Sequence, residues 1–171
     1  MRFFALLAFA PLLTAVAFAQ SADSQSTTDV ARQQALPHET QVRGYWTDPA
    51  TGLMWAGRDN GKDVSWKSAV KYCRDLRLAG YSDWRLSTLA ELEGIYDKNA
   101  NAPGRAGPPG KDRPFSGHVK GNLLLTGNQW SSIRFGGYAP RFDFNEGRVF
   151  NGDEITFYTN KRALCVRGSG E

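Results

Sequence analysis

The stretch Leu78-Ala-Gly-Tyr-Ser-Asp-Trp-Arg-Leu86 separates two segments of helical character, and this arrangement decides the fold. Gly80 ends the first segment, because glycine is unfavourable inside a helix and common just after one. Trp84-Arg85-Leu86 then leads into the second segment. The sequence around this stretch therefore predicts two short helices joined by a connection that is not helical.

Both flanking segments carry the start signals and the apolar spacing of helices. Ser65 is a good N-cap, and the residues that follow it place apolar side chains on one helical face: Trp66, Ala69, Val70, Cys73 and Leu76. Thr88 and Glu91 form a capping box at the start of the second helix, which continues through Leu92. We expect both apolar faces to be buried in the core.

Strand signals lie on both sides of the helices. Residues 43–55 predict a hairpin, because Asp48-Pro49-Ala50-Thr51-Gly52 has turn chemistry and is flanked by aromatic and apolar residues. Later strands are expected at 130–133, 138–144, 148–150, 155–158 and 163–166, with turns at 145–147 and 151–152. Two helices and several antiparallel strands predict an α+β fold.

Residues 99–121 are rich in proline and glycine, so they predict a long loop. Between Lys98 and Arg134 the chain has 6 lysines and arginines against one acid, Asp112, which is a local excess of +5. Arginine forks match sulfate and carboxylate oxygens, and long loops on a rigid scaffold commonly carry function. We therefore expect a surface for an anionic ligand, formed by Arg105, Lys111, Arg113, Lys120, Arg134 and Tyr138. Among the aromatic residues, Phe135, Tyr138 and Tyr158 are the candidates for exposed ring stacking. The equal alternative is a solvated loop whose charges only keep it soluble.

Residues 1–19 have the pattern of a secretory signal peptide. Arg2 supplies the positive start, residues 3–18 are almost wholly apolar, and Ala17-Phe18-Ala19 presents small residues to a signal peptidase. The apolar run is too short for a stable membrane anchor, although an uncleaved anchor is the alternative. We expect a periplasmic or secreted protein with no membrane span after cleavage. Its parts would be a disordered tether at 20–40, one domain at 41–168 and a tail at 169–171.

The net charge and the number of cysteines limit the classes of function that we expect for this chain. The formal net charge is +4, and without Arg2 the balance is 20 basic against 17 acidic residues, which is too weak and too interspersed to indicate nucleic-acid binding. Cys73 and Cys165 are the 2 cysteines, and export to an oxidising compartment favours a disulfide between them over two buried thiols. We expect no cofactor and no metal, and as partner either an anionic polysaccharide or another envelope protein.

The order of the motifs resembles that of the Lcl C-terminal domain family. The motifs are Thr51-Gly-Leu-Met-Trp55, Tyr72-Cys73 at the end of a Trp-led helix, Leu78–Leu86, Glu91-Leu92, Trp130-Ser-Ser132, Phe142–Gly147 and Cys165-Val-Arg167. The resemblance covers about residues 43–167, with Ser87 where the family usually has proline. It implies a C-type-lectin-like fold, with two helices, a small twisted antiparallel sheet, a long irregular loop and terminal strands brought together. It also implies an association with sulfated polysaccharides.

The resemblance also raises two alternatives of a different class. The fold is distantly shared with formylglycine-generating enzymes, which need a reactive cysteine pair. Here a structural bridge explains the cysteines better, and His38 and His118 lie in the tether and the loop, so we expect no catalytic residue. A calcium-dependent lectin site would use the oxygen ligands of residues 143–154, namely Asp143, Asn145, Glu146, Asn151, Asp153 and Glu154. These are also ordinary turn residues, so solvated turns are the favoured interpretation. A structural envelope protein without a small ligand is the runner-up to the binding domain.

Overall fold

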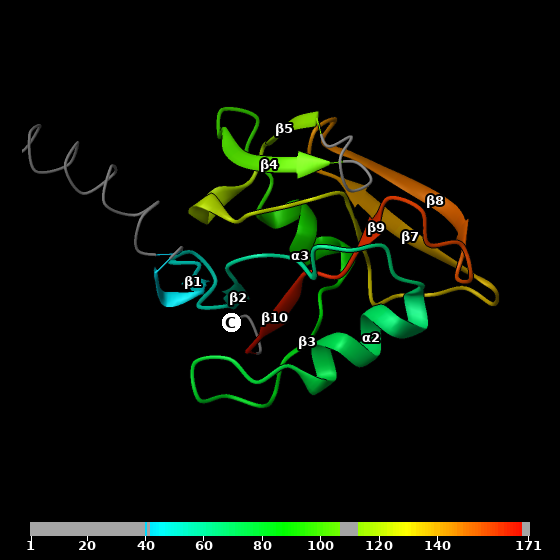
Figure 1. The fold of residues 1–171 in the computed structure, drawn as a ribbon, viewed down its shortest axis with the longest axis horizontal. Helices are drawn as coiled ribbons and strands as arrows, with labels where there is room; N and C mark the ends of the chain where they lie inside the picture. Colours follow the sequence, from blue (N-terminus) through cyan, green and yellow to red (C-terminus); the bar gives the residue numbers. More distant parts are fainter. Residues whose placement is uncertain (1–39, 41, 107–112, 169–171) are drawn as a thin grey trace, which may run out of the picture. The chain divides into compact units, whose positions relative to one another are not determined.

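Among the residues that the structure describes, two helices and small, mainly antiparallel sheets make the α+β fold that the sequence predicts (Figure 1). The computed structural model describes residues 40, 42–106 and 113–168. The expected signal peptide, most of the expected tether and the tail therefore lie outside the described residues. No helix in the described part of the chain is long and apolar enough to cross a membrane.

Helices α2 (Trp66–Asp75) and α3 (Leu89–Gly94) begin at the predicted caps. The Ser65 side chain accepts a hydrogen bond from the amide of Ser68, and at α3 both bonds of the capping box between Thr88 and Glu91 are present. These bonds satisfy amide groups that have no partner within the helix itself. Local sequence is enough to place both helix starts.

The first sheet has the strand order β1 (Tyr45–Thr47), β2 (Met54–Ala56), β10 (Cys165–Arg167), β3 (Arg85–Leu86), and all its pairs are antiparallel. Its first two strands form the predicted hairpin. In the turn, Asp48 accepts bonds from the amide of Ala50 and the hydroxyl of Thr51. Because β10 lies between β2 and β3, the last strand joins the start of the domain to its middle.

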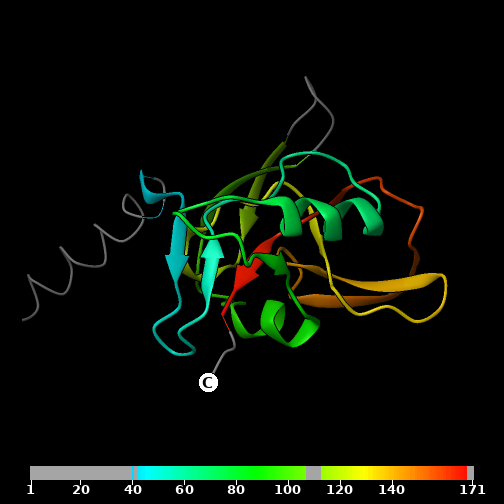
Figure 2. The ribbon, with the colours of Figure 1, turned by 90° about the horizontal axis from the view of Figure 1, so that it is seen from below.

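This first sheet is a buried layer with a separate apolar cluster on each face. Trp55 and Val166 face a cluster that contains Leu92 of α3, whereas Ala56 and Cys165 face the cluster of α2. The alternation follows from the two-residue repeat of a strand. Figure 2 shows α2 and α3 on opposite sides of β10.

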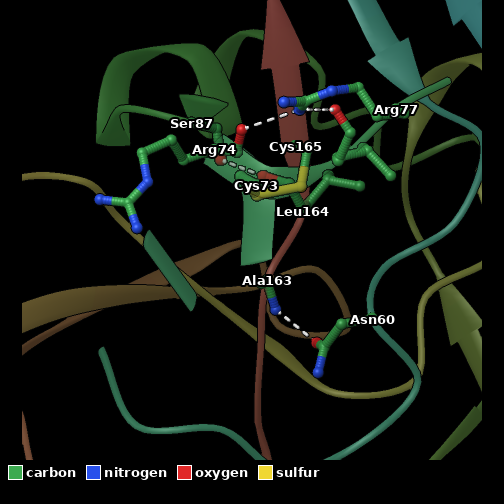
Figure 3. The surroundings of a disulfide bond; sticks show 9 residues. Asn60, Cys73, Arg74, Arg77, Ser87, Ala163, Leu164 and Cys165 are labelled. Atoms are coloured by element: carbon green, nitrogen blue, oxygen red, sulfur yellow. Dashed lines mark hydrogen bonds between the residues drawn. A yellow bond between two sulfur atoms is a disulfide. The ribbon is translucent and has the colours of Figure 1, made fainter. Parts of the chain in front are cut away.

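The disulfide forms as predicted and lies inside the α2 cluster. Cys73 on α2 and Cys165 on β10 are joined with a Cα–Cα distance of 5.3 Å, and both residues are fully buried (Figure 3). Nearby, the amide of Ala163 donates to the side-chain oxygen of Asn60 at 2.7 Å. The bridge therefore joins helix α2 to β10, an interior strand of the first sheet.

The second sheet corrects the expectation of a wholly antiparallel arrangement. Its order is β8 (Arg148–Glu154), β7 (Tyr138–Asp143), β6 (Asn128–Trp130), β9 (Lys161–Arg162), and β6 pairs with β9 in parallel. The chain leaves β8, crosses through residues 155–160 and returns beside the start of β6. Sequence periodicity does not reveal such a nonlocal pairing.

The strand expected at 155–158 is also wrong, because β8 continues through the expected turn at Asn151-Gly152. The β7–β8 register shifts between Ala139, which pairs with Asp153, and Arg141, which pairs with Phe150. Two residues of β8 thus lie opposite the single residue Pro140, which is a β-bulge. Gly152 has φ of 93°, so it absorbs the irregular backbone within the strand.

A β-hairpin replaces most of the loop expected at 99–121. Strand β4 (Ala102–Ala106) pairs antiparallel with β5 (Arg113–Gly117), and these two strands form a sheet of their own. In an antiparallel ladder, pairs that exchange two hydrogen bonds alternate with pairs that exchange none. Pro103 pairs with Ser116, and Pro114 pairs with Arg105 two positions further along, so both prolines lie in pairs of the same kind. Proline has no amide hydrogen, so these must be the pairs that exchange no hydrogen bond. Proline therefore fits this hairpin, although its abundance suggested a loop.

Candidate ligand-binding surfaces

The predicted cationic residues fall into two groups on different elements. Arg105 lies in β4 and Arg113 in β5, while Lys111 lies outside the described residues. Lys120 begins the short 3-10 helix η1 (Lys120–Asn122), directly after the hairpin. We call Arg105, Lys111, Arg113 and Lys120 the hairpin cations. The other two predicted residues, Arg134 and Tyr138, lie before and at the start of β7.

The η1 segment is tied to the first sheet and to α3. The Lys120 ammonium donates to the carbonyl of Gly94 at 2.8 Å, and the backbone amide of Lys120 donates to the carbonyl of Ile95. Gly121 has φ of 69° and lies against the Trp46 ring, where an added Cβ would be 2.2 Å from the nearest ring atom. Glycine is therefore required here by both backbone and space.

The hairpin strands carry basic residues without acidic ones. Neither Ala102–Ala106 nor Arg113–Gly117 contains Asp or Glu, and Asp112 is the one acid between Lys98 and Arg134. A paired backbone holds the positions of Arg105 and Arg113 more firmly than a loop would. The hairpin thus holds basic residues at defined positions of its backbone.

A second surface is formed by two short segments that carry exposed aromatic rings. We call it the aromatic end and define it by Ile133, Arg134, Phe135, Tyr138, Phe157 and Tyr158. Phe135 and Tyr138 exchange both backbone hydrogen bonds around Gly136-Gly137, so they enclose a two-residue turn. Tyr138 pairs with Glu154 at the end of β8, and the amide of Ile155 donates to the carbonyl of Gly137 at 2.9 Å. The turn and the segment after β8 therefore lie side by side.

Helix α2 supports this end through Trp66. The Trp66 indole donates to the carbonyl of Ser131 at 2.8 Å, and the backbone amide of Trp66 donates to the carbonyl of Ile155. The Arg134 guanidinium lies 5.5 Å from the Trp66 ring centroid and donates to the carbonyl of Gly136. Trp66 is half-buried, in keeping with its predicted place on the apolar face of the helix.

A network of ion pairs lies next to the aromatic end. Asp153 accepts from Arg141 at 2.5 Å and lies 3.5 Å from the ammonium of Lys161, whose side chain is almost wholly buried. The same ammonium is 4.8 Å from the Phe157 ring centroid. Burial, together with the nearby charge of Arg141, lowers the pKa of Lys161. The network joins the segment after β8 to the second sheet, and no local sequence pattern predicts it.

The carboxylates of residues 143–154 are largely engaged by protein groups. Asp143 accepts from the amides of Asn145 and Glu146, as an ordinary turn residue does. Glu146 lies 3.7 Å from Arg148, and Asp153 belongs to the ion network. No group of three or more His, Cys, Asp and Glu side chains within the described residues could hold a metal ion.

The two cysteines and the described histidine, which were considered for catalysis, are engaged by other protein groups. Both cysteines are used in the disulfide. His118 lies after β5, with its Nδ1 2.7 Å from the carbonyl of Ala100, and His38 lies outside the described residues. The thiol chemistry of a formylglycine-generating enzyme therefore has no free thiol to use.

Asp59 is a buried carboxylate that the sequence did not single out. It accepts from the amides of Gly61 and Thr126, from the Thr126 hydroxyl and from the Gln129 amide group, at 2.7–2.9 Å. Burial raises the pKa of Asp59, although these hydrogen bonds oppose the rise. Its hydrogen bonds join the loop after β2 to the segment that begins β6.

Comparison with known families adds one finding. The model of the Lcl C-terminal domain matches residues 44–167, which is most of the chain and nearly all of the described part. No curated protein matches the chain. The match begins at the first sheet and ends at its last strand, so it includes both surfaces.

Proposed function

This chain belongs to the Lcl C-terminal domain family, and from that premise we propose that it is an exported, non-catalytic domain that binds anionic glycans without calcium. The resemblance that suggested sulfated polysaccharides also implies a C-type-lectin-like arrangement of the two helices and sheets. A disulfide suits a protein that works in the periplasm or outside the cell.

The hairpin is the observation that carries this proposal. It holds Arg105 and Arg113 on paired strands, Lys111 lies between those strands in sequence, and Lys120 follows. Arginine and lysine bind sulfate and carboxylate groups through charge-assisted hydrogen bonds. A repetitive polyanion can contact several such cations at once, so contacts that are weak singly add up.

The alternatives of other classes receive less support from the side chains. Buried, bridged cysteines do not favour thiol catalysis, and carboxylates engaged by arginine, lysine and backbone amides do not favour a calcium site. The remaining competitor is a structural envelope component that binds no glycan. It predicts no glycan affinity at any salt concentration.

The test is a titration of the mature protein with a heparin octasaccharide between about 20 mM and 500 mM salt, where screening shortens from beyond 10 Å to below 8 Å. The test variant changes all four hairpin cations to serine. Exposed ion contacts contribute about 0.2–1 kcal/mol each, so the variant should bind roughly fourfold to several-hundredfold more weakly at low salt. Its affinity should also depend less steeply on salt.

A matched control removes the same charge elsewhere, by changing Lys62, Lys71, Arg74 and Arg77 to serine. These residues are exposed in and around α2, on a part of the surface that the proposal does not use. The control should bind nearly as the wild type does. If the wild type does not bind at low salt, or if the two variants weaken binding equally, the proposal is wrong.

A further inference from the structure

The exposed apolar side chains of the described residues are concentrated at one place. Seven large hydrophobic side chains are exposed, and five of them belong to the aromatic end: Ile133, Phe135, Tyr138, Phe157 and Tyr158. Phe135 is 71% exposed and Tyr158 is 57% exposed. Clustered exposed apolar groups indicate an interaction surface, whereas scattered ones do not.

We propose that the aromatic end is a saccharide-stacking site that binds a pyranose unit of an anionic polysaccharide, with an acidic group of that unit at Arg134. The inference rests on the proposed function for its ligand class. It adds a second site on different elements, and this site works by ring stacking rather than by charge alone.

The rings are mounted on backbone that is already held in place. The Phe135–Tyr138 turn is closed by two hydrogen bonds, and a third from Ile155 joins it to the segment that carries Phe157 and Tyr158. The amide of Lys161 donates to the carbonyl of Tyr158, and that of Phe157 donates to the carbonyl of Glu154. Little backbone entropy is therefore lost when a ligand binds.

Arg134 supplies charge complementarity for an acidic sugar. Its guanidinium stacks over Trp66 and donates to a backbone carbonyl, and within residues 42–106 and 113–168 no carboxylate pairs with it. A guanidinium presents five N–H donors, so donors remain for a carboxylate or sulfate. Glu154 is the one acidic residue within 154–160, where it is exposed next to Tyr138 in the register.

The composition of the surface favours a saccharide over a protein or lipid partner. Four of the five exposed apolar side chains are aromatic, and two of these carry a hydroxyl group. Polar residues flank the adjacent pair Phe157 and Tyr158, with Thr156 before it and Thr159 and Asn160 after it. A sugar ring offers an apolar C–H face and a rim of hydroxyls, so alternating rings and hydrogen-bonding groups suit it. Insertion into lipid would require a more continuous apolar face.

The experiment compares the heparin octasaccharide with chitohexaose, a neutral control, on the mature protein across the same salt series. The test variant is Phe135→Ser with Tyr138→Ser and Tyr158→Ser. We expect heparin affinity to fall roughly tenfold or more at every salt concentration, because aromatic contacts depend little on ionic strength. The slope of affinity against salt should stay near that of the wild type. A control with Val42→Ser and Tyr81→Ser, two exposed residues elsewhere, should bind normally.

A second readout locates the contact. Heparin should shift the amide resonances of Gly136 and Gly137 and the indole N–H of Trp66 in nuclear magnetic resonance spectra, more strongly than chitohexaose does. Binding that is unchanged in the triple variant, with no shift at these three positions, would overturn this inference alone. A wild type that binds no heparin would overturn the proposed function as well. Stronger binding to phosphatidylglycerol vesicles than to heparin, or self-association lost in the triple variant, would assign the surface to a membrane or to a second copy instead.

Discussion

At the scale of single residues, the disulfide gives the sharpest stability prediction. Cys73 and Cys165 are fully buried and join α2 to β10, an interior strand of the first sheet. Cys73→Ala should lower the free energy of unfolding by about 2–5 kcal/mol, because the unfolded chain loses a long closed loop and the core loses a packed sulfur. Urea unfolding under non-reducing conditions measures this, and Cys165→Ala should give a similar loss. Two free thiols in the denatured, unreduced wild type would contradict the bridge.

Asp59 shows what sequence reasoning could not reach at this scale. Its partners Thr126 and Gln129 lie 67 and 70 residues away along the chain. A buried carboxylate costs free energy unless hydrogen bonds satisfy it, and here four donors do so. No local sequence pattern predicts a buried carboxylate whose partners are so distant along the chain. The cysteine pair was predictable because only one pairing is available to two cysteines.

At the scale of elements, the start of α3 depends on Glu91. This carboxylate completes the capping box and accepts hydrogen bonds from both terminal nitrogens of the Arg85 guanidinium, at 2.8 Å and 2.6 Å. Burial acts to raise the pKa of Glu91, but the bonds from Arg85 and Thr88 outweigh it and hold the pKa below its usual value. We expect Glu91→Gln to cost about 1–2 kcal/mol of stability at pH 7, discounted because Arg85 is partly exposed.

The same contact predicts a definite pH dependence. The folded protein binds the Glu91 proton more weakly than the unfolded chain does, so its stabilisation is complete above the unfolded pKa of about 4.3. It is lost as the pH falls through the lower folded pKa. The difference between wild type and Glu91→Gln should therefore disappear in acid. Glu93→Gln, on the same helix and exposed, should change stability by less than about 0.5 kcal/mol at any pH.

Elements with local signals were predictable, and those that depend on pairing were not. The caps at Ser65 and Thr88 and the turn at Asp48 are defined by side chains a few residues apart, and all three are confirmed. The β4–β5 hairpin was missed because its prolines suit a strand only in one register. The bulge at Gly152 was mistaken for a turn, because Asn-Gly serves in both. In each case the deciding partner lies on another strand.

At the scale of the whole molecule, the two surfaces contribute different physical terms. The hairpin cations act through charge, which salt screens over about 8 Å at physiological ionic strength. The aromatic end acts through ring contacts that salt barely affects. The cations were predictable as a group from composition. The sequence singled out Phe135, Tyr138 and Tyr158 as candidates for ring stacking, but it did not show that they lie near one another, because residues 133–138 and 157–158 are brought together by the β7–β8 pairing and by the hydrogen bond from Ile155 to Gly137.

This separation predicts that the hairpin can be removed while the domain still folds. Strands β4 and β5 pair only with each other among the described strands, and Ala102 pairs with Gly117 at their base. Replacing residues 103–116 by an Asn-Gly turn should keep that base closed, because Asn-Gly favours the two-residue turn of a hairpin. We expect the shortened protein to retain its disulfide and to melt within about 5 °C of the wild type, since the buried clusters are left intact. Its heparin affinity should lose most of its salt dependence while keeping the resonance shifts at Gly136 and Gly137. A shortened protein that unfolds would show that the hairpin supports the core, and one that binds heparin with an unchanged salt slope would remove the hairpin from the binding surface.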